Sequence, residues 1–284
     1  MDDYYFHIKG DDLSSVKFDL SCAEVLFEIP PKEIHVKGII KWTNTNTPFS
    51  IFFHDPKART KDWLIYSNHN GTHSIESKFK VEKEVKEWID TFETSLSTIS
   101  LVLNKDLFYS HMVNSYHGIA HTTRVLFASY LLSHAINLGE DESRACCIAA
   151  IIHDLGKRSD REGAEHAYNS MMLYKERIGE IVQDSSLSTR ILLAIRYHSV
   201  ADKDCPTKVK NDVIWKVLKD ADALDRSRFS GRGCDKSFLR LGIYGSPIGQ
   251  NIIDLTTYLP CWTQNCDWSK PYEIIINQIT LFTL

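Results

Sequence analysis

The chain has 284 residues, of which 43% are hydrophobic and 25% are charged, and its formal net charge is −4. This balance is typical of a soluble globular protein, which argues against long disorder, and the length accommodates two unequal domains. Because the net charge is negative, the protein has no overall positive electrostatic potential to hold a nucleic-acid backbone, and we expect no non-specific nucleic-acid binding.

The N-terminus, MDDYYFHIKGDD, is acidic and lacks the basic and apolar regions of a secretory signal. The longest apolar run, residues 145–152, is much shorter than the roughly 20 residues that a membrane helix needs. Seven cysteines show no disulfide-framework spacing. We therefore expect a cytoplasmic protein that does not enter the membrane.

Short alternating segments, separated by turn-forming residues, fill the chain from about residue 14 to 76. A period of two predicts strands. The predicted strands are residues 16–20, 25–29, 34–36, 49–53 and 63–66. We expect them to form a small antiparallel β domain over residues 1–78.

From about residue 79 onward, the hydrophobic period lengthens to that of helices. The first predicted helix begins near Phe79, and the later ones cover about 117–137, 141–156, 163–178, 187–199, 212–225 and 270–282. The predicted fold class is therefore α+β, with an all-α domain over residues 79–284.

Two histidines stand four residues apart in the predicted helix 117–137. His117 and His121 share one helix face and can point at a common centre. A metal site is one interpretation, and two packed or surface histidines are the other.

A histidine and a carboxylate follow a strongly apolar helical segment. His153 and Asp154 end the predicted helix 141–156, and burying both groups is costly unless an ion or a partner satisfies them. A metal ion would do so. The pair by itself is also compatible with a helix end capped by a carboxylate.

Three carboxylates stand late in the predicted helix 212–225. Asp220, Asp222 and Asp225 oppose the helix dipole there, which favours a compensating cation. Lys219 and Arg226 could supply part of that charge.

The ordered set His121, His153-Asp154 and Asp222 resembles the H…HD…D signature of the HD superfamily of metal-dependent phosphohydrolases. The sequences of segments 121–125, 153–157 and 219–225 resemble the local sequence patterns around the ligands of that family. This resemblance implies an all-α HD-type domain in which these four residues hold one or two divalent cations.

Further histidines resemble those of particular HD members. His117-Gly118 stands before the first ligand, as in members with an extra His-Gly-x-x-His motif, which include a phosphodiesterase branch. The positions of Glu165-His166 and of His198 in the chain also resemble those of corresponding residues in the phosphodiesterase branch. The Gly-Tyr-Pro extension of the HD-GYP branch is absent, which argues against cyclic-di-GMP as the substrate.

The resemblance implies a role for each of these residues. The expected metal ligands are His121, His153, Asp154, Asp222 and His166; the expected catalytic residues are His117, Lys157, Glu165 and His198; the expected substrate-binding residues are Arg228 and Arg232. Arg124 is expected to pair with a carboxylate such as Asp225. Imidazole and carboxylate ligands suit Mn, Fe, Co, Ni or Zn, with Mg left open.

The function implied is hydrolysis of a phosphodiester in a small nucleotide-type substrate, such as a cyclic or ADP-ribose-like nucleotide. Two alternatives stay open: a nucleotidase that acts on monoesters, and a sensor that binds a nucleotide without hydrolysing it. A third hypothesis assigns the β domain to recognition of a protein partner.

Overall fold

The computed structural model describes residues 81–282 except 229–233 and 264–265, and the backbone of six strands before residue 75. Within the helical part, side chains are described except at residues 258, 261, 262, 281 and 282. The chain divides into two units, and Val81–Arg228 with Cys234–Ile279 form the helical one. The predicted domain boundary at residues 78 and 79 lies outside the described residues.

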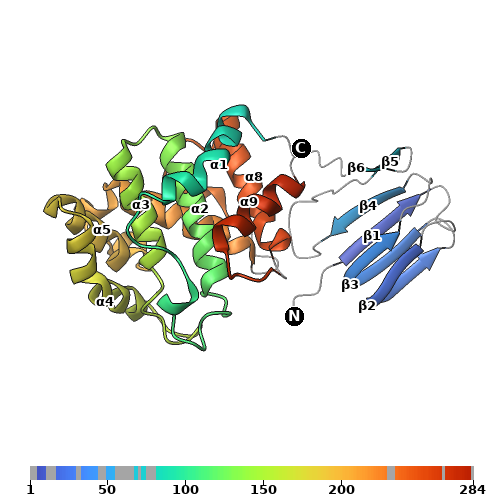
Figure 1. Ribbon diagram of the computed structural model, residues 1–284, viewed down its shortest axis with the longest axis horizontal. Helices are drawn as coiled ribbons and strands as arrows, with labels where there is room; N and C mark the ends of the chain where they lie inside the picture. The colour runs from blue at the N-terminus through green and yellow to red at the C-terminus, as the bar shows by residue number, and fades with distance from the viewer. Residues whose placement is uncertain are drawn as a thin grey trace. The chain divides into compact units, whose positions relative to one another are not determined.

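The helical unit is built from α-helices joined by short 3₁₀ turns (Figure 1). The longer helices are α1 (Lys83–Leu96), α2 (Ile119–Ala135), α3 (Glu140–Ile152), α4 (Glu165–Ile181), α5 (Ser185–Tyr197), α7 (Val213–Leu224), α8 (Pro247–Trp262) and α9 (Pro271–Phe282). The short elements are η1 (Lys105–Leu107), η2 (Asp202–Asp204), α6 (Thr207–Lys210), η3 (Asp225–Arg228) and η4 (Lys236–Phe238).

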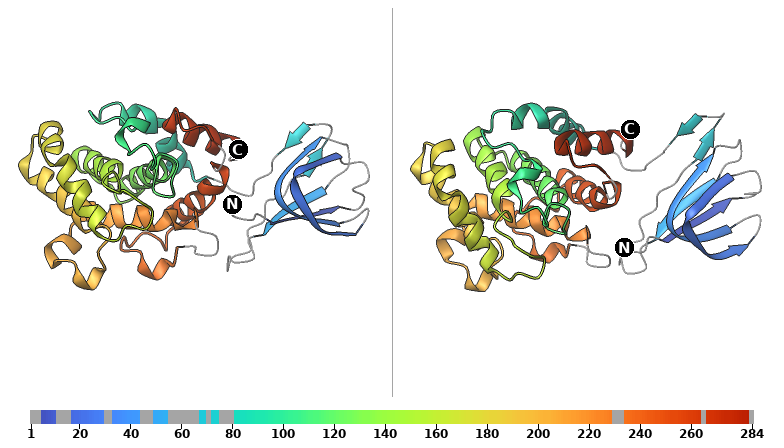
Figure 2. Two further views of the ribbon diagram at one scale, coloured as in Figure 1. Left: turned by 90° about the horizontal axis from the view of Figure 1, so that it is seen from below. Right: turned by 60° about the horizontal axis from the view of Figure 1, so that its bottom comes forward.

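Helix α2 lies inside this unit and contacts α1, α3, α7 and α8 (Figure 2). Its residues are buried on nearly every side, including Phe127, Leu131 and even Arg124. A helix without a polar face must be covered all round, which explains its central position. Trp215 of α7 is among the largest fully buried side chains of the surrounding core.

The predicted helices at 117–137, 141–156, 163–178, 187–199, 212–225 and 270–282 are confirmed within a few residues by α2, α3, α4, α5, α7 and α9. Helix α8 was not predicted. It begins at Pro247, and the Ser246 hydroxyl accepts a hydrogen bond from Gly249 N at 3.0 Å. Serine followed by proline is a helix-start signal that could have revealed it.

Strands occur before residue 75 and are described by their backbone alone. They are β1 (Tyr5–Gly10), β2 (Lys17–Ile29), β3 (Glu33–Thr43), β4 (Phe49–His54), β5 (Ser67–His69) and β6 (Thr72–Ser74). The first four pair antiparallel in the order β2-β3-β1-β4, with Phe6 opposite Val36 and Phe53, and β5 pairs with β6. The predicted strand at 63–66 lies outside the described residues.

The predicted α+β fold class is wrong, because the part of the chain whose side chains are described shows the predicted all-α domain alone and no β domain. From Val81 onward the described residues contain helices and no strand, which supports an all-α fold. The strands before residue 75 are described by their backbone alone, so the described residues do not show a β domain with a packed face.

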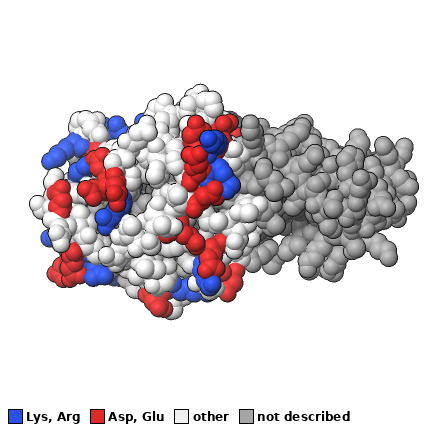
Figure 3. Space-filling view, turned by 45° about the horizontal axis from the view of Figure 1, so that its top comes forward, with Lys and Arg blue, Asp and Glu red and all other residues white. Residues whose placement is uncertain are grey.

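The surface of the helical unit carries charges of both signs. On the face shown in Figure 3, acidic and basic side chains are interspersed. Within the described parts of the chain, no helix combines the length and the apolar character that crossing a bilayer requires.

Candidate metal centre

Five helices bring six predicted site residues to one place in the helical unit. They are His121 on α2, His153 and Asp154 just after α3, His166 in the first turn of α4, His198 just after α5, and Asp222 in the last turn of α7. The four histidines and Asp154 are buried, whereas the Asp222 side chain is 26% exposed. The cluster thus opens to solvent on the Asp222 side.

Nδ1 of each of the four imidazoles contacts an oxygen atom outside the cluster. Nδ1 of His153 donates to Ala150 O at 2.7 Å, and Nδ1 of His198 donates to Ile195 O at 2.7 Å. His166 Nδ1 contacts Gly163 O at 2.6 Å, and His121 Nδ1 contacts the Asp225 carboxylate at 2.7 Å. For His121, His153 and His198 these partners are pure acceptors, so Nδ1 carries the proton. Nδ1 of His166 also lies 3.3 Å from Lys157 Nζ, which is a donor.

The opposite ring nitrogens therefore turn their lone pairs towards one another. Nε2 of His121 lies 3.2 Å from Nε2 of His153, and Nε2 of His166 lies 3.2 Å from Nε2 of His198. Asp154 stands between the two pairs. Its Oδ1 lies 3.0 Å from His166 Nε2, yet this oxygen has no partner in hydrogen-bond geometry.

Buried acceptors that face only other acceptors repel one another unless a cation lies between them. Two sets of ligand atoms each lie within 4.8 Å of one another: His121, His153 and Asp222 form one, and His153, Asp154 and His198 form the other. Both sets have the nitrogen and oxygen chemistry of divalent transition-metal sites. The residues therefore fit one or two such ions.

The electrostatics favour an anionic Asp154 and a neutral His153. For His121 and His166, burial lowers the pKa, but hydrogen bonds with Asp154, and for His121 also with Asp225, raise it overall, so in the metal-free protein these two rings favour a proton more than His153 does. Burial lowers the pKa of His153 to about 3. Burial alone would raise the pKa of Asp154, but the surrounding histidines hold it well below its usual value. A charged carboxylate and an unprotonated imidazole are the forms that bind metal.

Asp225 holds His121 in position from behind. Besides His121, its carboxylate accepts hydrogen bonds from Arg124 Nε at 2.6 Å and from Arg228 Nη1 at 3.1 Å. The predicted pairing of Arg124 with Asp225 is confirmed. Burial would raise the pKa of Asp225, but the arginines and His121 hold it well below its usual range. The contact with His121 was not predicted from sequence.

His117 lies at the rim of the cluster. Its ring centre is 5.6 Å from that of His121, and its Nδ1 donates to Asp160 Oδ1 at 2.8 Å. Tyr116 N contacts the other oxygen of Asp160 at 3.4 Å. The contribution of Asp160 was not predicted from the sequence. This residue stands in a polar turn, Arg158-Ser159-Asp160-Arg161, where no helical periodicity indicates which way a side chain points.

The turn after Asp154 is held tightly against α4. A Cβ on Gly156 would lie 2.2 Å from Ser170 N, and Gly156 N donates to the Ser170 hydroxyl at 2.8 Å. Lys157 is buried, and its Nζ donates to Glu162 O at 3.2 Å. This lysine therefore lies against the loop that leads to His166.

The remaining predicted site residues are not all brought to the cluster. Arg228 reaches it indirectly, through Asp225. Glu165 is exposed in the first turn of α4 and is not one of the residues that the cluster brings together. Arg232 lies outside the described residues.

The chain order of these ligands agrees with a known family. Residues 118–227 match the HD domain family. The match includes all six residues of the cluster and supports assignment to the HD superfamily, whose members are in general metal-dependent hydrolases. No curated protein and no solved structure matches the chain.

The HD domain and its histidine and aspartate cluster support binding of a divalent metal. The family match begins at Gly118, so it does not include His117 or say which branch of the superfamily is closest.

Proposed function

We propose that this protein is a metal-dependent phosphohydrolase that cleaves a phosphodiester bond in a small nucleotide-type substrate. The observation that carries the proposal is the double histidine cluster around Asp154. His166 and His198 extend the four core residues of an HD site, and their Nε2 atoms face the same carboxylate as those of His121 and His153.

Divalent ions bound there would neutralise charge on the phosphate and acidify the attacking water. The proposed ligands are His121, His153, Asp154, His166 and Asp222, with His198 beside them. Asp225, the two arginines bound to it and the backbone carbonyls fix the orientation of the imidazole rings. A ring held in one orientation needs no rearrangement when the metal binds.

Hydrolysis of an ester also requires a proton for the leaving oxygen. We assign this step to His117, because it lies at the rim and Asp160 holds its Nδ1. An imidazole oriented by a carboxylate through one nitrogen presents the other nitrogen to the substrate. Burial lowers the pKa of His117, although Asp154 and Asp160 oppose that shift.

Lys157 and Arg228 are assigned to supporting positions. In the structure each is bound to backbone or carboxylate groups around the ligands. We propose that their positive charge favours an anionic substrate without a direct bond to the scissile phosphate.

The test combines elemental analysis with a substrate panel. The purified protein is loaded separately with Mn, Fe, Co, Ni, Zn and Mg and assayed on cyclic nucleotides, ADP-ribose, and nucleoside monophosphates. We expect bound metal and turnover of a diester. His117→Asn should lower kcat on diesters by about 10² or more without removing the metal.

Two results would contradict the proposal. Turnover of monoesters alone would make the protein a nucleotidase, and bound metal without turnover of any phosphoester would make it a nucleotide sensor. Leu173→Ala is a matched surface control, because Leu173 is exposed on α4 and has no role in the cluster.

A further inference from the structure

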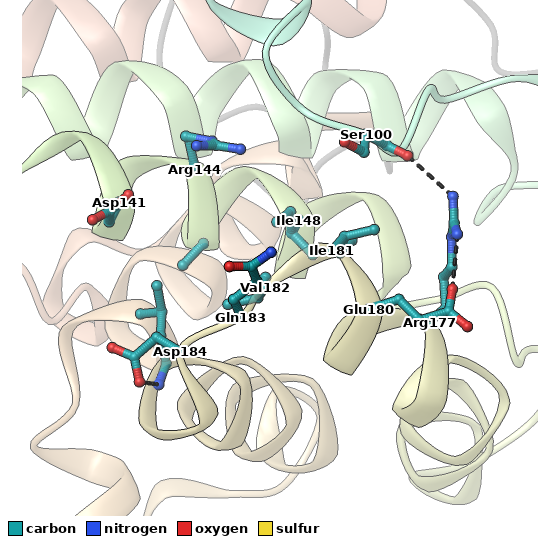
Figure 4. A pocket seen from close by; sticks show the side chains of 12 residues that line it. Ser100, Asp141, Arg144, Ile148, Arg177, Glu180, Ile181, Val182, Gln183 and Asp184 are labelled. Atoms are coloured by element: carbon teal, nitrogen blue, oxygen red, sulfur yellow. Dashed lines mark hydrogen bonds and ion pairs between the residues drawn. The ribbon is translucent and has the colours of Figure 1, made fainter.

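A cavity of about 660 Å³ lies at the far ends of three helices that reach the metal centre (Figure 4). It is lined by the first half of α3, the end of α4 and the start of α5. His153, His166 and His198 stand at the opposite ends of the same helices. Arg144 lies nine residues before His153, roughly 14 Å along the axis of α3, so this space is separate from the metal centre.

Arg144 is incompletely paired. Its Nη2 donates to Thr98 O at 3.1 Å, but its Nε is buried and has no hydrogen-bond partner. Within the described residues it forms no ion pair, whereas Arg190 on the neighbouring helix is paired with Glu142 and Asp212. A buried N–H group without an acceptor is costly, and a guanidinium binds oxyanions through two N–H groups at once.

Three other charged groups of the cavity, Arg177, Glu180 and Asp184, are already occupied, whereas Asp141, three residues before Arg144 on α3, forms no ion pair among the described residues. Arg177 donates to Glu180 at 2.8 Å and to Ser100 O at 3.4 Å, as the dashed lines in Figure 4 show. Asp184 accepts hydrogen bonds from two backbone N–H groups at the start of α5. Arg144 is thus the cation in this lining that no carboxylate neutralises.

The size and the lining indicate the class of ligand. A volume of 660 Å³ lies in the range of small-molecule sites. Figure 4 shows the carboxamide of Gln183 extending towards α3, and Ile148 and Ile181 add apolar surface. The carboxylates of the lining disfavour a ligand with several negative charges. A ligand that fits this cavity in size and charge is a polar metabolite that carries a single oxyanion group.

We propose that this cavity is a second ligand site, which binds a small metabolite carrying one phosphate or carboxylate group through Arg144. The ligand would accept hydrogen bonds from the terminal N–H groups of the Arg144 guanidinium and would lie against α3, α4 and α5. The proposal is independent of the chemistry at the metal centre.

The test uses the full chain, freed of metal by dialysis so that oxyanions do not bind at the histidine cluster through an ion. Ribose 5-phosphate, gluconate and uncharged ribose are titrated by calorimetry into the wild type, Arg144→Gln and Arg161→Gln. The last variant is a matched control, because Arg161 is exposed and lies outside this cavity.

We expect one of the two oxyanion probes to bind the wild type and Arg161→Gln equally. Arg144→Gln should bind it about tenfold or more weakly, and ribose should bind none of the proteins. If Arg144→Gln does not fold, Arg144→Lys should show a smaller loss, because lysine keeps the charge without the planar fork. Equal binding by wild type and the Arg144 variants would overturn the proposal, as would the absence of binding by both oxyanion probes.

Discussion

Replacing Asp154 by asparagine gives the sharpest test of the proposed metal centre, in which four histidines surround this carboxylate. The two oxygens of Asp154 lie between 3.0 and 3.6 Å from the Nε2 atoms of four histidines. Asparagine has nearly the same shape, but it loses the negative charge and gains two N–H donors. Asp154→Asn should therefore remove metal binding and at the same time relieve the repulsion in the metal-free protein.

The size of the effect follows from ligand linkage. Removing one partner of a buried charge pair costs roughly 3–5 kcal/mol, so the metal Kd should rise by about 10² to 10³ or more. At a metal concentration 100 times the wild-type Kd, the ion stabilises the wild type by about 2.7 kcal/mol and the variant by about 0.4 kcal/mol or less. For a domain of this size, the difference corresponds to roughly 5–10 °C in Tm.

The assay is thermal unfolding of wild type and variant, with Mn²⁺ and after metal removal, together with elemental analysis. We expect a metal-dependent rise in Tm for the wild type only, and a metal-free Asp154→Asn variant at least as stable as the metal-free wild type. Asp90→Asn is the control, since Asp90 is exposed on α1, pairs with Lys86 and is not part of the cluster. A variant that keeps the full metal-dependent rise would refute the reasoning.

Three further predictions concern the surroundings of the cluster. Asp225→Asn should lower the unfolding free energy by about 3–5 kcal/mol and weaken metal binding by about 10- to 100-fold, because Arg124 loses its carboxylate; urea unfolding and metal titration measure the two effects. The depressed pKa of His153 means that the unfolded chain binds the extra proton below pH 6.5, so His153 should stabilise the metal-free protein above that pH and lose this contribution as the pH falls towards 3. Urea unfolding at pH 7 and pH 5 measures this loss, and His153→Gln should flatten it. Gly156→Ala should destabilise the protein by about 1–3 kcal/mol because its Cβ would meet backbone, whereas Gly179→Ala, with open space around its Cβ, should not; similar Tm values for both variants would contradict this.

The sequence predicted the core of the metal centre because its residues stand in local, recognisable contexts. His153 and Asp154 follow a strongly apolar helix, and Asp222 ends another. Hydrophobic periodicity also located most helices within a few residues, since that pattern is set by the face each helix buries. Helix α8 was missed because its start signal is a local Ser-Pro cap rather than a clear period.

The fold class was the clearest error. Alternating residues before position 75 do form strands in the backbone, but alternation is a local property and cannot show how a sheet packs into a domain. The described side chains, from Val81 onward, pack in an all-α unit.

The kinds of ligand and their order along the chain could be predicted from the sequence, and the family match at 118–227 covers the predicted metal ligands. Only the tertiary structure decided which nitrogens face Asp154, that Asp225 lies behind His121, and that Asp160 holds His117. The physical reason is that ring orientation depends on hydrogen bonds between residues far apart in the chain. The incompletely paired Arg144 became visible for the same reason, because a missing partner can be recognised only when all neighbours are in place.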